Sequence, residues 1–169
     1  LKMDDLKVDM LSIGAHKFYG PKGVGALYVR EGTPLIPVQT GGSQEFGKRA
    51  ATENLPLIVG MAEALQMVYE EAYQRQKHTQ KLRDRVISNV LGDIPDSTLT
   101  GHPESRLPNH ASFAFQGLDG NLLVSALDVE GFACSSGSAC KTGNSEPSSV
   151  LLSMGFDPGW AKGSLRDTV

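Results

Sequence analysis

The stretch SIGAHKFYGPKGVGALYV, residues 12–29, decides how this chain is interpreted. Two short apolar runs, VDMLSI at 8–13 and VGALYV at 24–29, predict two buried strands joined by the loop GAHKFYGPKG. Lys17 lies in this loop, where glycines let a ligand approach the backbone closely. Most loop lysines are solvated charges, but burial against a protein interior lowers the pKa of a lysine and leaves a nucleophilic amine.

The composition is that of a globular protein. The chain has 169 residues, of which 40% are hydrophobic and 21% are charged, with a net charge of -3. No block of Lys and Arg indicates nucleic-acid binding, and no apolar run reaches the roughly 20 residues that span a bilayer. Two cysteines and no export signal lead us to expect a cytoplasmic protein. The first residue is not Met and the last ones, LRDTV, read like the start of a strand, so we expect a fragment truncated at both ends.

The remaining periodicity predicts an α/β chain with two parts. Residues 35–54 predict an ordered loop, and a long helix begins near Asn54. Apolar residues recur every three to four positions as far as Ala72 and resume from Leu82 to Val90, after the wholly polar stretch 74–81. The second part is α+β. It has expected strands at 111–115 and 132–134 and expected helices at 120–129 and 148–154. We place the division inside the long helix, with domains at 1–65 and 66–169.

The stretch CSSGSAC, residues 134–140, holds both cysteines, and the residues alone leave their role open. A disulfide is a poor default without an export signal, and the four histidines (16, 78, 102 and 110) show no metal-ligand spacing, so we expect no metal site. Cys134 ends the apolar segment GFAC, which predicts a buried, inert thiol. Cys140 is followed by Lys141 in a loop of small residues, which predicts an exposed thiol that a nearby cation makes more acidic.

Five segments occur in an order that is similar to one known family. They are S-x-x-x-H-K-x-Y-G-P-K-G at 12–23, GGSQE at 41–45 with RAATEN at 49–54, GHP at 101–103 with RLPN at 106–109, SSGSAC at 135–140 with EPS at 146–148, and SLR at 164–166. Together they resemble the cysteine desulfurases of the NifS/IscS class, which are pyridoxal phosphate (PLP) enzymes of fold type I in the class V aminotransferase family. The segments extend over nearly the whole chain.

The resemblance implies a fold, a reaction and a set of site residues. The fold is the C-terminal portion of the enzyme: the end of the large α/β domain, a long linking helix and a small α+β domain. The reaction converts L-cysteine to L-alanine and leaves a persulfide on Cys140, supplying sulfur for iron–sulfur cluster assembly or tRNA thiolation. Lys17 and Cys140 are the implied catalytic residues, Lys17, His16 and Thr52 hold PLP, and Arg166 binds the substrate carboxylate. The position of Thr52 serves the neighbouring subunit's cofactor, which implies a homodimer; an iron–sulfur scaffold or another sulfur acceptor is the implied partner.

Four positions depart from the family pattern. Gly14 stands where a phosphate-binding Ser is usual, Ser43 and Ala51 replace glycines, and Asp167 replaces an apolar residue after Arg166. The usual partner of the PLP ring nitrogen would lie before residue 1, so we expect the chain by itself to bind PLP weakly. The alternatives are a class V aminotransferase or selenocysteine lyase, or an inactive fragment with only a structural or partner-binding role.

Overall fold

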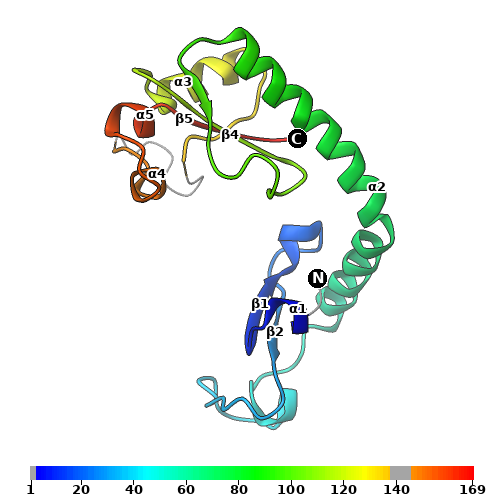
Figure 1. The fold of residues 1–169 in the computed structure, drawn as a ribbon. Coiled ribbons are helices and arrows are strands. Elements are labelled where there is room, and N and C mark those ends of the chain that lie inside the picture. Colours follow the sequence, from blue (N-terminus) through cyan, green and yellow to red (C-terminus); the bar gives the residue numbers. More distant parts are fainter. Residues whose placement is uncertain (1–2, 138–145) are drawn as a thin grey trace. The chain divides into compact units, whose positions relative to one another are not determined.

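The structure is a computed structural model that describes residues 3–137 and 146–169. The chain divides into two compact units, Leu1–Ala72 (unit 1) and Tyr73–Val169 (unit 2), each of which is described by itself. The division falls inside the 39-residue helix α2, Leu55–Asp93 (Figure 1). One long helix beginning next to Asn54 was expected from the sequence, and the structure confirms it.

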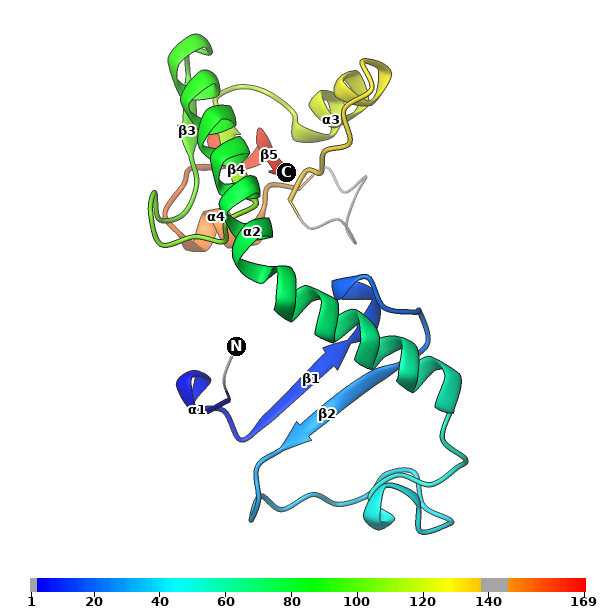
Figure 2. The same cartoon turned by 90° about the vertical axis from the view of Figure 1, so that its right-hand side faces the viewer.

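Unit 1 is built on an antiparallel pair of strands, β1 (Met10–Gly14) and β2 (Gly25–Val29), which run side by side in Figure 2. The short helix α1 (Met3–Leu6) precedes them, the 3-10 helix η1 (Ala15–Phe18) lies between the two strands, and a second 3-10 helix, η2 (Gln44–Gly47), follows β2. Both strands were predicted, but the expectation that they are buried is wrong for the described chain. Leu27 keeps 52% of its surface exposed, because no second layer within the described residues covers that face.

Helix α2 begins where its sequence signals predict. The amide of Leu57 donates to Oδ1 of Asn54 at 3.4 Å, so Asn54 supplies one of the acceptors that the first turn of a helix lacks. Pro56 lies in this first turn, where a missing N–H has no cost. In unit 1 the helix packs on the loop after η1, since a Cβ added to Gly60 would lie 3.2 Å from Cγ of Pro21.

Unit 2 is a three-stranded antiparallel sheet with helices on both faces. The strand order is β3 (Ser97–Leu99), β4 (His110–Phe115), β5 (Ser164–Thr168). The helices are α3 (Gly120–Val129), α4 (Ser149–Ser153) and α5 (Pro158–Lys162). The sequence prediction is confirmed for β4, α3 and α4, whereas β3 and α5 were not predicted.

The predicted strand at 132–134 is wrong. The amides of Gly131 and Phe132 donate to carbonyls of Asp128 and Leu127, so these residues complete the last turn of α3 instead of extending. Gly131 has φ +87°, a left-handed conformation that suits glycine after a helix. Pairing begins later, at Ser135, which forms an isolated bridge with Arg166.

The alternation of side chains along β4 gives unit 2 two apolar layers. On one face Phe113, which is 1% exposed, packs with Phe115 and Leu165 against α2 and α3. On the other face Ala114 packs with Leu151 of α4 and Ala161 of α5. No helix among the described residues is long and apolar enough to cross a membrane.

Candidate functional site

Lys17 and His16 lie next to each other on η1, immediately after β1. Ala15, at the start of this turn, is fully buried, and its amide donates to the Val24 carbonyl at 3.2 Å, which ties η1 to the beginning of β2. Lys17 and His16 are both exposed. Within the described part of unit 1 the Lys17 side chain is therefore not placed against an interior, and its amine is accessible to a ligand.

The turn after Lys17 has a fixed shape that explains the Tyr-Gly pair. Tyr19 adopts φ +68°, and the amide of Gly20 donates back to the Ala15 carbonyl at 2.9 Å. A Cβ on Gly20 would lie 2.9 Å from Cβ of Ala15, so a larger residue would push the turn open. The glycine therefore holds η1, and with it Lys17, in a closed loop.

Gly14 stands at the junction of β1 and η1. An added Cβ would lie 3.2 Å from Cε1 of His16, so the His16 ring packs directly over the glycine. A serine at this position would require that ring to shift by a few tenths of an ångström. The departure at Gly14 is thus coupled to the orientation of His16.

Thr52 is exposed in the loop between η2 and α2. This loop is anchored by buried Ala50, whose amide donates to the Gln39 carbonyl at 3.0 Å. Ala51 has φ +87°, a left-handed conformation that favours the glycine of the family pattern. Ser43 has φ -87°, a conformation that does not require glycine. Among the described residues, Thr52 forms no hydrogen bond with His16 or Lys17.

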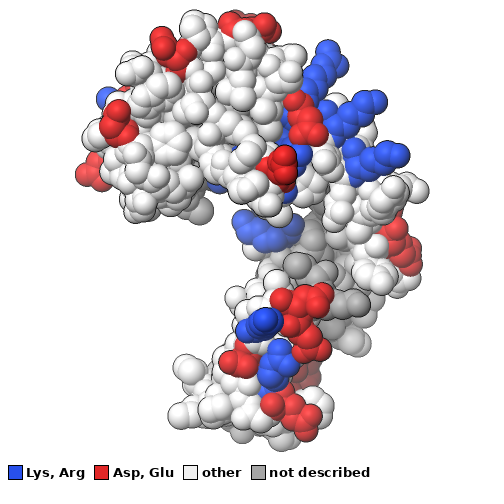
Figure 3. Space-filling model, in the orientation of Figure 1, with Lys and Arg blue, Asp and Glu red and all other residues white. Residues whose placement is uncertain are grey.

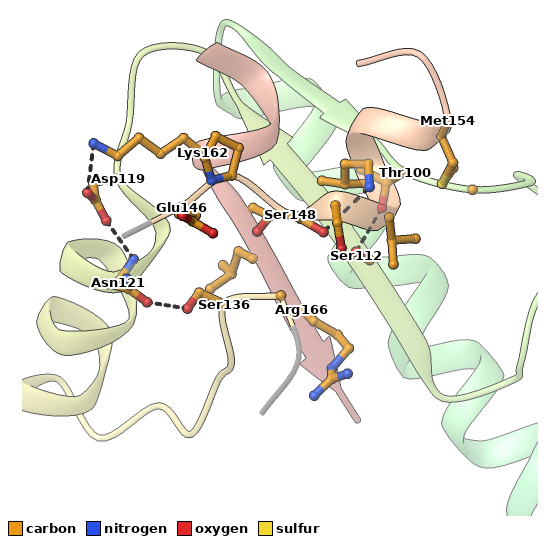
Figure 4. Close-up of a pocket in the computed structure, with 18 of the residues that line it drawn as sticks. Thr100, Ser112, Asp119, Asn121, Ser136, Glu146, Ser148, Met154, Lys162 and Arg166 are labelled. Atoms are coloured by element: carbon orange, nitrogen blue, oxygen red, sulfur yellow. Dashed lines mark hydrogen bonds and ion pairs between the residues drawn. The ribbon is translucent and has the colours of Figure 1, made fainter. Parts of the chain in front are cut away.

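Unit 2 contains a pocket of about 620 Å³ on the α4/α5 face of its sheet, and Arg166 lies in it (Figure 4). Cross-strand pairing sets Arg166 opposite Ser112, and Ser112 in turn accepts the Thr100 amide through its carbonyl at 2.8 Å. The hydroxyl of Thr100 donates to that of Ser112 at 2.7 Å. The three residues thus form a row across the strands, with Arg166 at one end and the hydrogen-bonded hydroxyls of Ser112 and Thr100 at the other.

Arg166 has no carboxylate within ion-pair distance among the described residues. Asp167 was a possible competitor, but adjacent residues of a strand point to opposite faces. The face of β5 opposite Arg166 is that of Leu165, and there the charge of Asp167 adds to burial, the larger cause, in raising the pKa of the Cys134 thiol. The guanidinium in the pocket is therefore available to an anionic ligand.

Two interactions join α3 to the pocket (Figure 4). Asp119 caps α3 by accepting the Asn121 amide at 3.0 Å and pairs with Lys162 of α5 at 3.2 Å, and the hydrogen bond from Lys162 lowers the pKa of the Asp119 carboxyl. The hydroxyl of Ser136 donates to Oδ1 of Asn121 at 2.6 Å. These contacts hold the chain at residue 136 over the pocket that contains Arg166.

The pocket also contains His110, which the sequence interpretation missed. Burial lowers the pKa of His110, and the positive charges of Arg106 and Arg166 lower it further. A signal was present in HASFAF, residues 110–115, because His110 and Ser112 alternate with apolar Ala111 and Phe113. Polar residues at every second position of a strand lie on the same face, which indicates that this face binds a ligand or contacts solvent instead of packing on the core.

The two cysteines have different outcomes. Cys134 is a free thiol that packs against the Phe113 layer, but it is half-buried and not fully buried as predicted, and burial raises its pKa. Cys140 lies in 138–145, outside the described residues. Within the described ranges no group of three His, Cys, Asp or Glu residues could hold a metal ion.

The comparisons with known proteins agree with the motif resemblance. The chain is 45% identical over 169 residues to the cysteine desulfurase IscS of Dictyoglomus turgidum, covering 100% of the chain and 43% of that protein. It is 43% identical over 167 residues to cysteine desulfurase IscS 1 of Archaeoglobus fulgidus, covering 99% of the chain and 44% of that relative. The chain therefore spans less than half the length of these relatives.

Solved structures give the same result. A NifS-like protein matches with a TM-score of 0.85 at 36% identity, over 100% of this chain and 43% of its own. The NifS-like protein of Rickettsia africae matches with a TM-score of 0.86 at 25% identity, over 100% and 44%. The family described as aminotransferase class-V matches residues 1–166. The predicted resemblance is confirmed, and the chain belongs to the aminotransferase class-V family.

Proposed function

We propose that the chain is the C-terminal part of a cysteine desulfurase, comprising the end of the large α/β domain, the linking helix α2 and the small α+β domain. The observation that carries the proposal is the guanidinium of Arg166, which has no ion-pair partner among the described residues and lies in a hydroxyl-lined pocket of unit 2. A free amino acid presents a planar carboxylate, which a guanidinium binds through two parallel hydrogen bonds. The similarity to IscS proteins supports cysteine as that amino acid.

Class-V aminotransferases and cysteine desulfurases depend on PLP, and the residues of unit 1 fit this cofactor. Lys17 offers an exposed amine on a rigid turn for covalent attachment, and His16 lies beside it. Thr52 offers an exposed hydroxyl, a suitable donor to a phosphate. When bound, PLP withdraws electrons from the substrate Cα.

The roles of the side chains follow from their chemistry. Arg166 binds the carboxylate of L-cysteine, and the Lys17 amine accepts the proton from Cα. The Cys140 thiolate attacks the substrate sulfur, so that an S–S bond forms while the bond between sulfur and Cβ breaks. The products are alanine and a persulfide on Cys140.

The persulfide sulfur passes to an acceptor, for which we propose an iron–sulfur scaffold protein or a tRNA-thiolation protein in the cytoplasm. We also propose a homodimer, in which Thr52 reaches the cofactor of the neighbouring subunit. The exposed position of Thr52, away from any hydrogen bond to His16 or Lys17 among the described residues, is consistent with that role.

Two mass measurements on the chain test the proposal, the first without turnover and the second with a single turnover. The chain is incubated with excess PLP and reduced with borohydride, which should attach a pyridoxyl group to Lys17 in preference to Lys22 and Lys48. A second sample receives L-cysteine before alkylation, which should reveal one additional sulfur on Cys140. Lys17→Ala should abolish both signals, and Cys140→Ala should abolish only the second.

The outcomes separate the proposal from its rivals. Labelling of Lys17 without sulfur on Cys140 would favour a class V aminotransferase. Equal labelling of all exposed lysines would contradict the cofactor site and favour a lobe with a structural role alone. Cys134→Ala is the matched control, because it removes a half-buried thiol and should leave both signals unchanged.

A further inference from the structure

The part of α2 that belongs to unit 2 carries a row of exposed side chains at every fourth position: Tyr73, Lys77, Lys81 and Arg85. We call these four residues the basic row. Figure 3 shows Lys and Arg side chains projecting next to one another from this part of the helix. Tyr73, at the N-terminal end of the row, keeps 75% of its surface exposed. The row spans about 18 Å along the helix axis.

The row lies on the side of α2 that faces away from the core of unit 2. The core side is marked by Val86, Ile87 and Val90, which pack on the Phe113 layer, and by buried Arg83. At about 100° per residue, Lys81 lies nearly opposite Val86 and Val90 on the helix circumference. The basic row therefore contributes nothing to the packing of unit 2.

The three cations of the row have no ion-pair partner within the described part of the chain. The acid next to them, Asp84, is bound by Arg83 at 2.6 Å through Oδ1. Like charges four residues apart on a helix repel each other, so the row destabilises the isolated helix. That repulsion is relieved when an acidic group binds between them.

Helix electrostatics do not account for the row. Cations stabilise the C-terminal end of a helix, but the effect falls off within the last turn, and Lys77 lies about four turns before Asp93. The charge of α2 is also segregated, since residues 55–73 contain Glu63, Glu70 and Glu71 but no Lys or Arg. A helix that is merely solvated more often mixes both signs along one face.

We propose that the basic row is a docking surface for an acidic segment of a partner protein. The segment would present carboxylates about 6 Å apart, the rise between residues four apart in a helix, and an apolar side chain against Tyr73. A protein fits better than a nucleic acid, because the chain has a net charge of -3 and the row offers three cations only. It fits better than a membrane surface, because the apolar face of α2 in unit 2 is occupied by the core.

The test is a binding titration with a labelled helical peptide of about 16 residues that carries Glu at every fourth position and Leu near one end. A second peptide has Gln in place of each Glu. The chain should bind the Glu peptide and not the Gln peptide, with an affinity that falls as KCl is raised. Lys77→Glu/Lys81→Glu should weaken binding by at least about tenfold, because like charges then face each other across the contact.

The matched control is Lys7→Glu/Lys48→Glu, which makes the same change in net charge at exposed positions of unit 1. This variant should bind the Glu peptide within about twofold of the original chain. Tyr73→Ala should weaken binding of the Glu peptide at high KCl, where the contribution of the cations is screened. Circular dichroism of each variant confirms that α2 is retained.

The proposal fails if the Glu peptide binds no more tightly than the Gln peptide, or if both double variants lose affinity equally. It also fails if a DNA duplex or vesicles of anionic lipid bind the row more tightly than the Glu peptide, because the surface would then serve a nucleic acid or a membrane. None of these measurements depends on PLP or on turnover, so the result is independent of the proposed desulfurase activity.

Discussion

His110 stands at the start of β4, on the strand face that lines the pocket, and its neighbours determine its charge. Across the sheet it pairs with Thr168, two residues beyond Arg166. Burial lowers the pKa of His110 first, and the charges of Arg106 and Arg166 lower it further. The folded chain therefore holds this imidazole neutral at pH values where an unfolded chain begins to protonate it.

This difference predicts that the stability of unit 2 depends on pH. Below the ordinary pKa of 6.5 the unfolded chain binds a proton that folded His110 does not, so the free energy of unfolding should fall as the pH drops from 6.5 to the folded pKa. Above pH 6.5 the effect is absent. Urea unfolding followed by the fluorescence of Trp160 at pH 7.5 and 5.5 measures it. The free energy of unfolding of His110→Gln should fall less between the two pH values than that of the original chain. An equal fall in the variant and the original chain would show that His110 does not cause the pH dependence.

At the scale of elements, the junction of α5 and β5 depends on close backbone packing. A Cβ on Gly163 would lie 2.0 Å from the carbonyl oxygen of Phe115, and the amide of Phe115 donates to the Gly163 carbonyl at 3.0 Å. Gly163 has φ -82°, so the requirement for glycine arises from contact and not from backbone conformation. The junction sets the register that places Arg166 opposite Ser112.

Gly163→Ala is therefore expected to destabilise unit 2 by about 1–3 kcal/mol, the usual range for forcing extra volume into a packed site. Urea unfolding at pH 7.5 provides the measurement. Gly92→Ala in α2 is the matched control, because nothing lies within 4 Å of the added Cβ, and it should stabilise the helix by up to about 1 kcal/mol. Similar urea midpoints for Gly163→Ala and Gly92→Ala would show that the junction of α5 and β5 accommodates the added Cβ without loss of stability.

At the scale of the whole molecule, burial is distributed unequally between the units. The buried hydrophobic residues of unit 1 are Ala15 and Ala50 alone among those described, whereas unit 2 buries two phenylalanines and two leucines. Burial of a Phe or Leu side chain stabilises a fold by about 1.5–3 kcal/mol each. Unit 2 therefore has most of the hydrophobic stabilisation of the chain.

Hydrogen exchange should reflect this inequality. Amides in β4 and β5 should exchange more slowly than those in β1 and β2, because local opening requires less energy where few apolar contacts break. Exchange of the chain followed by mass spectrometry measures both strand pairs in one sample. Equal protection of the two pairs would show that unit 1 is stabilised by interactions other than apolar burial.

Much of the architecture was predictable because it depends on neighbours in the sequence. The apolar period of α2, its cap at Asn54 and the alternation in HASFAF each fix a local conformation. The errors arose where local signals compete. Phe132 was assigned to a strand because it is apolar, yet it continues the turn that Gly131 makes at the end of α3. Helix α5 was missed although Asp157 and Pro158 form a helix start, with Asp157 accepting the Gly159 amide at 2.8 Å.

The sequence by itself determined the family, most of the elements and the candidates Lys17, His16, Thr52, Cys140 and Arg166, because motifs and periods are properties of residues close together in the chain. Only the tertiary structure decided which distant residues meet. Thr100, Ser112 and Arg166 form one row because the strands pair in a particular register, and Asp167 does not pair with Arg166 because adjacent residues face opposite sides of β5. Register depends on contacts made across the sheet, and these contacts have no signature within a single segment.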